Sequence, residues 1–261
     1  MKRRKLGQHF LYDSAILGRI ADEACIASYD TVVEIGPGTG SLTEILIARA
    51  NKVIAIGLDI TLYDRLKVRF SGCPNLELVH ADALTFDYSS IGAFKVAANI
   101  PYYITTPLIF RLLAERETLT GMTLLVQKEL AQRIASVPGR KSYGVLSVMT
   151  QLVSVPEIKF VVGRESFRPP PEVDSAVIGF QMLKAKRLNI TDERLFSLVV
   201  RTSFSMRRKT LGNNLRGLSA GVGDILKSIG IDAQRRPETL TIDEFARIAN
   251  AISHETVKPF F

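Results

Sequence analysis

The sequence predicts an α/β protein with a small helical C-terminal domain. Apolar segments of strand length alternate with amphipathic helical segments between residues 31 and 127, a pattern typical of a parallel sheet covered by helices. A glycine-rich turn, residues 36–40, joins the first of these strands to its helix. After the polar linker Lys184-Ala-Lys-Arg187 the pattern is only helical, so we expect domains at residues 1–184 and 185–261.

Periodicity and capping residues predict each element in turn. Asp13 or Ser14 can cap a first helix whose apolar residues recur at helical spacing up to Ala24. Two strands around the proline-rich loop at 167–175 suit a hairpin that closes the sheet edge. The expected strands are 31–35, 52–57, 76–80, 94–98, 122–127, 158–162 and 176–183, and the expected helices between them are 42–50, 61–70, 107–114, 128–137 and 143–152.

Composition narrows the classes of function. The chain has 261 residues and a net charge of +8, which favours a polyanionic partner, nucleic acid or an anionic membrane surface, over a merely solvated basic surface. Cys25 and Cys73 form no metal-binding or disulfide pattern, so we expect no metal site and a reducing, cytoplasmic compartment. No segment approaches the roughly 20 apolar residues of a membrane span, and polar residues interrupt any export signal.

The glycine turn Gly36-Pro-Gly-Thr-Gly40 lets the backbone approach a ligand closely. Its GxGxG pattern is neither the triphosphate-binding loop nor the complete dinucleotide fingerprint. It therefore favours a nucleoside without a pyrophosphate, such as S-adenosylmethionine, over a plain structural turn. Glu34 precedes this turn at the strand end, where ligands of open α/β sheets bind.

Two further strand ends carry polar groups. Asn99-Ile100-Pro101-Tyr102 follows a small apolar strand, and its amide, its oriented carbonyl and its phenol suit a planar ring with an exocyclic amine. The alternative is a strand that ends in a proline turn. Asp82 can accept from an adenine amine, or it can cap the segment that follows. Because parallel strands end at one sheet edge, we expect these groups to converge.

Several motifs occur together and in a fixed order, and they cover nearly the whole chain. The chain resembles the small-subunit ribosomal RNA adenine N6-dimethyltransferases, relatives of the erythromycin-resistance rRNA methyltransferases. The resemblance implies a Rossmann-like methyltransferase domain with a helical C-terminal domain, and dimethylation of two adjacent adenines in the 3′-terminal hairpin of small-subunit rRNA. The motifs that carry it are Leu6-Gly-Gln-His-Phe-Leu11, Glu34-Ile-Gly-Pro-Gly-Thr-Gly40, Asn99-Ile-Pro-Tyr102, Gln127-Lys-Glu129, Phe167-Arg-Pro-Pro-Pro-Glu-Val-Asp-Ser175 and Phe204-Ser-Met-Arg-Arg-Lys-Thr-Leu211.

By this resemblance, S-adenosylmethionine is the cofactor. His9 and Leu11 would line its methionine end, with Gly36 and Gly38 in the turn beneath it. Asp82 would bind its adenine.

The same resemblance implies the catalytic residues. Asn99 would lie between cofactor and target, where its side-chain oxygen and the Ile100 carbonyl would align the adenine amine. Tyr102 and Phe167 would clamp the target base between two aromatic rings.

One position departs from the family pattern. The family usually has Glu at the end of the second strand, where it binds both ribose hydroxyls, and this chain has Gly57. Losing such charged hydrogen bonds costs roughly 1.5–3 kcal/mol. Asp59 lies ~6.6 Å further along an extended strand and would need a shift to substitute. We therefore expect cofactor binding to be weak but not absent.

RNA contact is expected from basic residues, although a charge run is often only solvated. The resemblance implies small-subunit rRNA in a pre-ribosomal particle as the partner, with no membrane contact, and we expect a monomer. Decayed catalysis would leave an assembly or RNA-binding factor on the same fold; a methyltransferase of large-subunit rRNA or DNA is a third possibility. Arg216 and the N-terminal residues Lys2–Lys5 add further positive charge. The residues expected to bind RNA are Arg140, Lys141, Arg201, Arg207, Arg208 and Lys209.

Overall fold

The computed structural model describes residues 9–184, 188–219 and 221–256. It divides the chain into two compact units. The first contains residues 1–131 and 155–182, and the second contains residues 132–154 and 183–261. The second unit thus includes a segment from the middle of the chain, which the linear pattern did not suggest. The predicted linker includes residues 185–187, outside the described residues, and a division of the chain at residues 184 and 185 stays a prediction.

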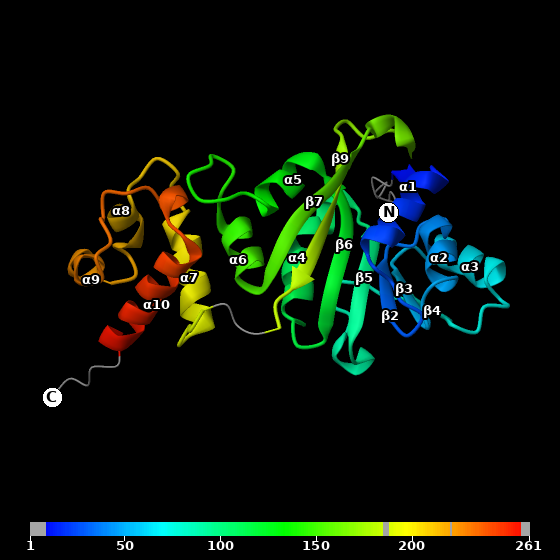
Figure 1. The fold of residues 1–261 in the computed structure, drawn as a ribbon, viewed down its shortest axis with the longest axis horizontal. Helices are drawn as coiled ribbons and strands as arrows, with labels where there is room; N and C mark the ends of the chain where they lie inside the picture. Colours follow the sequence, from blue (N-terminus) through cyan, green and yellow to red (C-terminus); the bar gives the residue numbers. More distant parts are fainter. Residues whose placement is uncertain (1–8, 185–187, 220, 257–261) are drawn as a thin grey trace, which may run out of the picture. The chain divides into compact units, whose positions relative to one another are not determined.

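A seven-stranded sheet forms the centre of the first unit (Figure 1). Five strands are parallel neighbours, and β9 runs antiparallel to β6. The strand order reverses at β2, which lies between β3 and β5, so a crevice opens there at the carboxyl ends of the strands. In sheet order the strands are β4 (Leu76–His80), β3 (Lys52–Gly57), β2 (Thr31–Ile35), β5 (Phe94–Asn99), β6 (Leu119–Gln127), β9 (Ser175–Met182) and β7 (Ser154–Val162).

Helices begin where the sequence offers caps. The Asp13 carboxylate accepts hydrogen bonds from two backbone amides at the start of α1, and Asp59 does the same for α3. Leu17 and Ile20 of α1 join Leu42 of α2 in one hydrophobic cluster with the strands. The helices of this part of the chain are α1 (Ser14–Glu23), α2 (Ser41–Ile47), α3 (Ile60–Arg69), α4 (Thr105–Leu113) and α5 (Lys128–Ile134), with the short 3₁₀ helices η1 (Ser89–Ile91), η2 (Tyr102–Ile104) and η3 (Arg164–Ser166).

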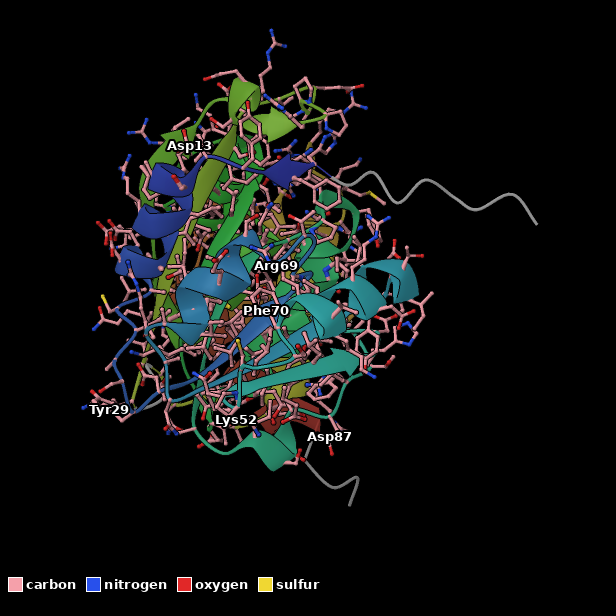
Figure 2. The ribbon with its side chains drawn as sticks, turned by 90° about the vertical axis from the view of Figure 1, so that its right-hand side faces the viewer. Asp13, Tyr29, Lys52, Arg69, Phe70 and Asp87 are labelled. Atoms are coloured by element: carbon pink, nitrogen blue, oxygen red, sulfur yellow. The ribbon has the colours of Figure 1, made fainter. Side chains whose placement is uncertain are left out.

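Figure 2 shows how the strand ends are oriented. Tyr29, in the loop before β2, and Lys52, the first residue of β3, lie together at the end of the sheet where these strands begin. Asp13 lies away from them, at the start of α1. The glycine turn and Gly57 follow the opposite, carboxyl ends of β2 and β3.

A second, two-stranded sheet was not predicted. In it, β1 (Phe10–Leu11) pairs antiparallel with β8 (Phe167–Arg168). A two-residue strand leaves no periodicity to detect, and its partner lies in the proline-rich loop far along the chain. This pairing joins the N-terminal segment to that loop.

The described part of the second unit is helical, as expected. Val148 and Leu152 of α6 form one core with apolar residues of α7 and α10, which lie side by side (Figure 1). That shared core explains why residues 132–154 belong to this unit. Its helices are α6 (Val145–Val153), α7 (Glu193–Ser203), α8 (Leu211–Leu215), α9 (Val222–Ser228), η4 (Pro237–Thr239) and α10 (Ile242–Thr256).

Two helices end earlier than the periodicity predicts. Helix α2 stops at Ile47 because the Asn75 side chain donates to the carbonyls of Ile47 and Ala50, at 2.9 and 3.2 Å. Helix α5 stops at Ile134, where the Gln151 side chain donates to the carbonyls of Ile134 and Ser136, at 2.9 and 2.8 Å. Within the described residues, no helix is both long and apolar enough to cross a membrane.

Candidate cofactor and target site

A cavity of about 300 Å³ lies at the carboxyl ends of the parallel strands. Its volume is at the lower end of the range for small-molecule sites. The strand order reverses beside it, so it occupies the crevice expected for a ligand of an open α/β sheet. Nine predicted residues line it, namely His9, Leu11, Gly36, Gly38, Gly57, Asp82, Asn99, Ile100 and Tyr102.

The glycine turn needs its glycines. Gly36 and Gly38 have φ angles of +71° and +57°, a region that other L-residues rarely adopt. A Cβ on Gly38 would lie 3.1 Å from the Phe10 ring, a tight contact that would require the ring to shift. The bare backbone therefore forms a wall of the cavity against which a flat nucleoside can lie. This wall and the apolar lining fit the nucleoside cofactor that the sequence suggested.

Asn99 and Tyr102 meet the N-terminal segment at the end of β5. The Asn99 amide nitrogen is 3.4 Å from the His9 carbonyl, to which it donates. The His9 ring stacks on the Tyr102 ring with a centroid separation of 5.8 Å. The Tyr102 hydroxyl lies 2.5 Å from the Ser175 hydroxyl, and burial raises the pKa of Tyr102, so the phenol stays protonated. Contacts with His9 and Ser175, both distant in the sequence, thus fix the Asn99 amide and the Tyr102 ring at the end of β5.

Two acidic side chains of the cavity also accept hydrogen bonds from nearby backbone amides. Asp82 accepts from the Leu84 amide at 2.9 Å, which stabilises a turn and not the helix start considered as the alternative. Asp59 caps α3 through the amides of Thr61 and Leu62. Its carboxylate is therefore not on a continuing strand, because β3 ends at Gly57.

Glu34 is the buried carboxyl group of the cavity wall, with 2% of its surface exposed. The Thr43 hydroxyl donates to it at 2.6 Å. Burial raises the pKa of Glu34 to about 8, because its charged form loses hydration that one hydrogen bond does not replace. The group is therefore mostly neutral at pH 7.

Phe167 is the predicted site residue that the structure does not bring to the cavity. Its ring is 2% exposed and lies in the hydrophobic cluster with Leu11, its register partner in β1. In this arrangement it offers no face to a base opposite Tyr102. An aromatic residue after a strand can bury its ring as readily as expose it, and the role of Phe167 opposite Tyr102 stays a prediction.

Lys2–Lys5 lie outside the described residues. The other predicted RNA-binding cations lie in the second unit, and two loops bring most of them together. The Arg207 guanidinium donates to the Lys141 carbonyl at 2.8 Å, and Arg236 donates to the Arg207 carbonyl at 3.4 Å. Arg201 belongs to a helix and not to these loops, in the last turn of α7. We use the name basic loops for the two loops that carry the exposed side chains of Arg140, Lys141, Arg207, Arg208 and Lys209.

A model of the ribosomal RNA adenine dimethylase family matches residues 1–254. The chain belongs to this family. It is 41% identical over 256 residues to ribosomal RNA small subunit methyltransferase A of Clostridium acetobutylicum, covering 95% of this chain and 93% of the relative. The protein of the same name from Geobacter metallireducens is 41% identical over 261 residues, covering 96% of this chain and 95% of the relative.

Solved structures agree with this membership in the dimethylase family. A dimethyladenosine transferase from Plasmodium falciparum has a TM-score of 0.83 and 29% identity, covering 95% of this chain and 98% of that chain. The 23S rRNA methyltransferase ErmE has a TM-score of 0.74 and 28% identity, covering 94% and 99%. The chain therefore has the Rossmann-like methyltransferase fold with a helical C-terminal part.

Some cavity residues of this dimethylase family member were not predicted. Tyr63 of α3 and Tyr103 of η2 both line the cavity, as does Phe10 of β1. Tyr63 follows the capping residue Asp59 by one helical turn, so both lie on one helix face. Among the described residues, no group of three or more His, Cys, Asp and Glu side chains is placed to hold a metal ion.

Proposed function

We propose that this protein transfers methyl groups from S-adenosylmethionine to N6 of two adjacent adenines in the 3′-terminal hairpin of small-subunit rRNA. The observation that carries the proposal is a cavity in which the glycine turn meets Asn99 and Tyr102. A nucleoside wall and an amine-binding group then share one space. The printed names of the relatives support the same reaction on the same class of RNA.

The cavity residues fit the cofactor in the following roles. Gly36 and Gly38 provide the bare wall, Asp82 accepts from the adenine amine, and His9 and Leu11 line the methionine end. When bound in this cavity, S-adenosylmethionine would supply an electrophilic methyl group to the amine nitrogen, and its sulfur would keep the electron pair of the broken bond.

Asn99 orients the attacking amine. The lone pair of an adenine amine is delocalised into the ring, and acceptors on its N–H bonds turn it toward the methyl group. The Asn99 side-chain oxygen and the Ile100 carbonyl are such acceptors, since the Asn99 nitrogen already donates to His9. The nitrogen becomes acidic only after transfer, so its proton leaves to water and no strong base is required. Orientation of this kind contributes much of the rate in two-reactant steps.

Tyr102 provides the stacking face for a target base that has left its helix. Such a base loses stacking that a protein ring replaces, at about 1–3 kcal/mol per base. Phe167 becomes the second ring of this clamp only if its side chain leaves the hydrophobic core, and that role stays a prediction.

The basic loops bind RNA phosphates in this proposal. Their cations are exposed and lie on a chain with a net charge of +8. We place the reaction in the cytoplasm, on a pre-ribosomal particle, with the protein acting as a monomer. An assembly factor without catalysis is the alternative; the methyltransferase names of the relatives and the retained Asn99–Tyr102 segment do not favour it.

The test uses isotopically labelled S-adenosylmethionine and immature small subunits from a strain that lacks the endogenous enzyme. We expect methyl incorporation at N6 of two adjacent adenines. Tight binding to the subunits without incorporation would instead support the assembly factor, and incorporation into large-subunit RNA would assign a different substrate.

A further inference from the structure

The end of β3 lacks the acidic group that usually binds a ribose in this type of unit. In βαβ nucleotide sites, an acidic residue about 20 residues after the glycine turn hydrogen-bonds the ribose hydroxyl. Here that strand end is Gly57, which lines the cavity. A Cβ on Gly57 would lie 3.5 Å from Pro37 Cδ, an ordinary contact, so neither strain nor crowding requires glycine. The ribose edge of the cavity therefore has room and no carboxylate from this strand.

Asp59 also lines the cavity, but one oxygen of its carboxylate already caps α3. It stands at the start of α3, and its Oδ1 accepts from the amides of Thr61 and Leu62 at 2.9 and 3.3 Å. Turning this group toward a ligand would release two amides at the helix N-terminus. The next residue on the same helix face is Tyr63, one turn later.

Tyr63 lines the cavity, and its ring is held beside the end of β3. The His80 ring lies 5.6 Å from the Tyr63 ring, and His80 is the register partner of Gly57 between β4 and β3. The Lys67 ammonium lies 5.7 Å from the centroid of the same ring. The ring is thus packed from two elements next to the vacant strand end. Its hydroxyl makes no hydrogen bond to any other residue that the structure describes.

We propose that Tyr63 binds the ribose hydroxyls of the cofactor in place of a strand-end carboxylate. A phenol both donates and accepts, so it can pair with either hydroxyl. Because the phenol is uncharged, each contact is weaker than one to a carboxylate. The proposal rests on the proposed function, since it requires a nucleoside cofactor in this cavity.

The test is calorimetric titration with S-adenosylhomocysteine and with its 2′-deoxy and 3′-deoxy analogues. We expect Tyr63→Phe to weaken S-adenosylhomocysteine binding by about 3- to 10-fold, the effect of one neutral hydrogen bond. At least one deoxy analogue should bind wild type and variant equally well, because it lacks the paired hydroxyl. The matched control is Tyr29→Phe, which removes a phenol oxygen from a side chain that is 81% exposed at the opposite end of the sheet (Figure 2).

A second variant separates hydrogen bonding from packing. In the Gly57→Glu background a carboxylate takes the ribose hydroxyls, so adding Tyr63→Phe should weaken S-adenosylhomocysteine binding by less than it does in wild type. Equal losses for S-adenosylhomocysteine and both deoxy analogues would overturn the proposal, as would a Tyr63→Phe protein that binds like wild type. Failure of wild type to bind S-adenosylhomocysteine at all would instead refute the proposed function.

Discussion

The cavity and the basic loops differ in how their functional groups are positioned. The cavity collects side chains from the ends of four strands and from β1, and tertiary packing holds each of them. The basic loops carry exposed cations on two segments, joined by the hydrogen bond from Arg207 to the Lys141 carbonyl. In the cavity, binding and catalysis depend on the exact position of individual atoms. On the loops, the total charge matters more than the position of any one side chain. Substitutions should therefore have large, specific effects in the cavity and small, additive, salt-dependent effects on the loops.

The largest expected effect comes from Asn99→Ala. It removes the side-chain acceptor of the adenine amine, so the rate of methyl transfer should fall by about 10²–10³-fold. RNA binding should persist, because the basic loops are untouched. A single-turnover assay with labelled cofactor measures the first quantity, and a filter-binding assay the second. Retained turnover would remove Asn99 from the mechanism.

Gly57→Glu should act in the opposite direction. A carboxylate at the end of β3 can accept from the ribose hydroxyls, and charged hydrogen bonds of this kind correspond to about 10- to 100-fold in affinity. Calorimetry with S-adenosylhomocysteine checks this. The matched control is Gly72→Glu, which adds the same charge at an exposed glycine with no atom within 4 Å of a new Cβ. Equal affinities of wild type and Gly57→Glu would mean that the vacant strand end does not face the ribose.

Glu34→Gln should change the pH dependence of folding. The unfolded carboxyl ionises near its ordinary pKa of 4.5, whereas the folded one holds its proton up to about pH 8. Between these values the folded state binds more protons, so wild-type stability falls as pH rises through this window. From pH 6 to pH 9 the Glu34 contribution to that fall is about 3 kcal/mol.

Urea unfolding of wild type and Glu34→Gln at pH 6 and pH 9 measures this contribution as the difference between their pH dependences. The exposed Glu172→Gln serves as the control. If both proteins lose the same stability between the two pH values, the Glu34 carboxyl ionises with an ordinary pKa.

The smallest effect is expected from the double substitution Arg208→Ala and Lys209→Ala. Loss of two phosphate contacts should weaken RNA binding by about 3- to 10-fold at 0.15 M salt. It should also reduce the slope of log affinity against log salt concentration by about two. The control pair is Arg194→Ala and Lys227→Ala, exposed cations of the same unit outside the basic loops. An equal loss in the control would show that net charge alone governs binding.

Local sequence signals predicted most of the fold. Asp13 before an apolar periodicity predicted α1, and small apolar residues before Asn99 predicted β5, because caps and strand ends depend on neighbouring residues. The paired sheet β1–β8 escaped prediction since two residues have no detectable period. The end of α2 also escaped it, because the stop is supplied by the distant Asn75 side chain.

The candidate site was predictable where backbone chemistry is specific. The pattern of Gly36-Pro-Gly-Thr-Gly40 demands unusual φ angles that few sequences permit, and the polar groups at the strand ends converge because parallel strands share an edge. Tyr63 was missed because a tyrosine on an amphipathic helix has the same pattern whether it packs or binds.

By itself, the sequence determined the order of elements, the glycine turn, the vacant position at Gly57 and the positive charge, since each depends on residue type and local spacing. Only the tertiary structure decided that Phe167 packs in the core, that residues 132–154 join the C-terminal helices and that the Tyr63 ring lies beside the end of β3. Those outcomes depend on contacts between segments far apart in the chain. The free energy of burying an apolar side chain depends on the area buried and not on which apolar partner covers it, so the sequence alone does not specify the partner.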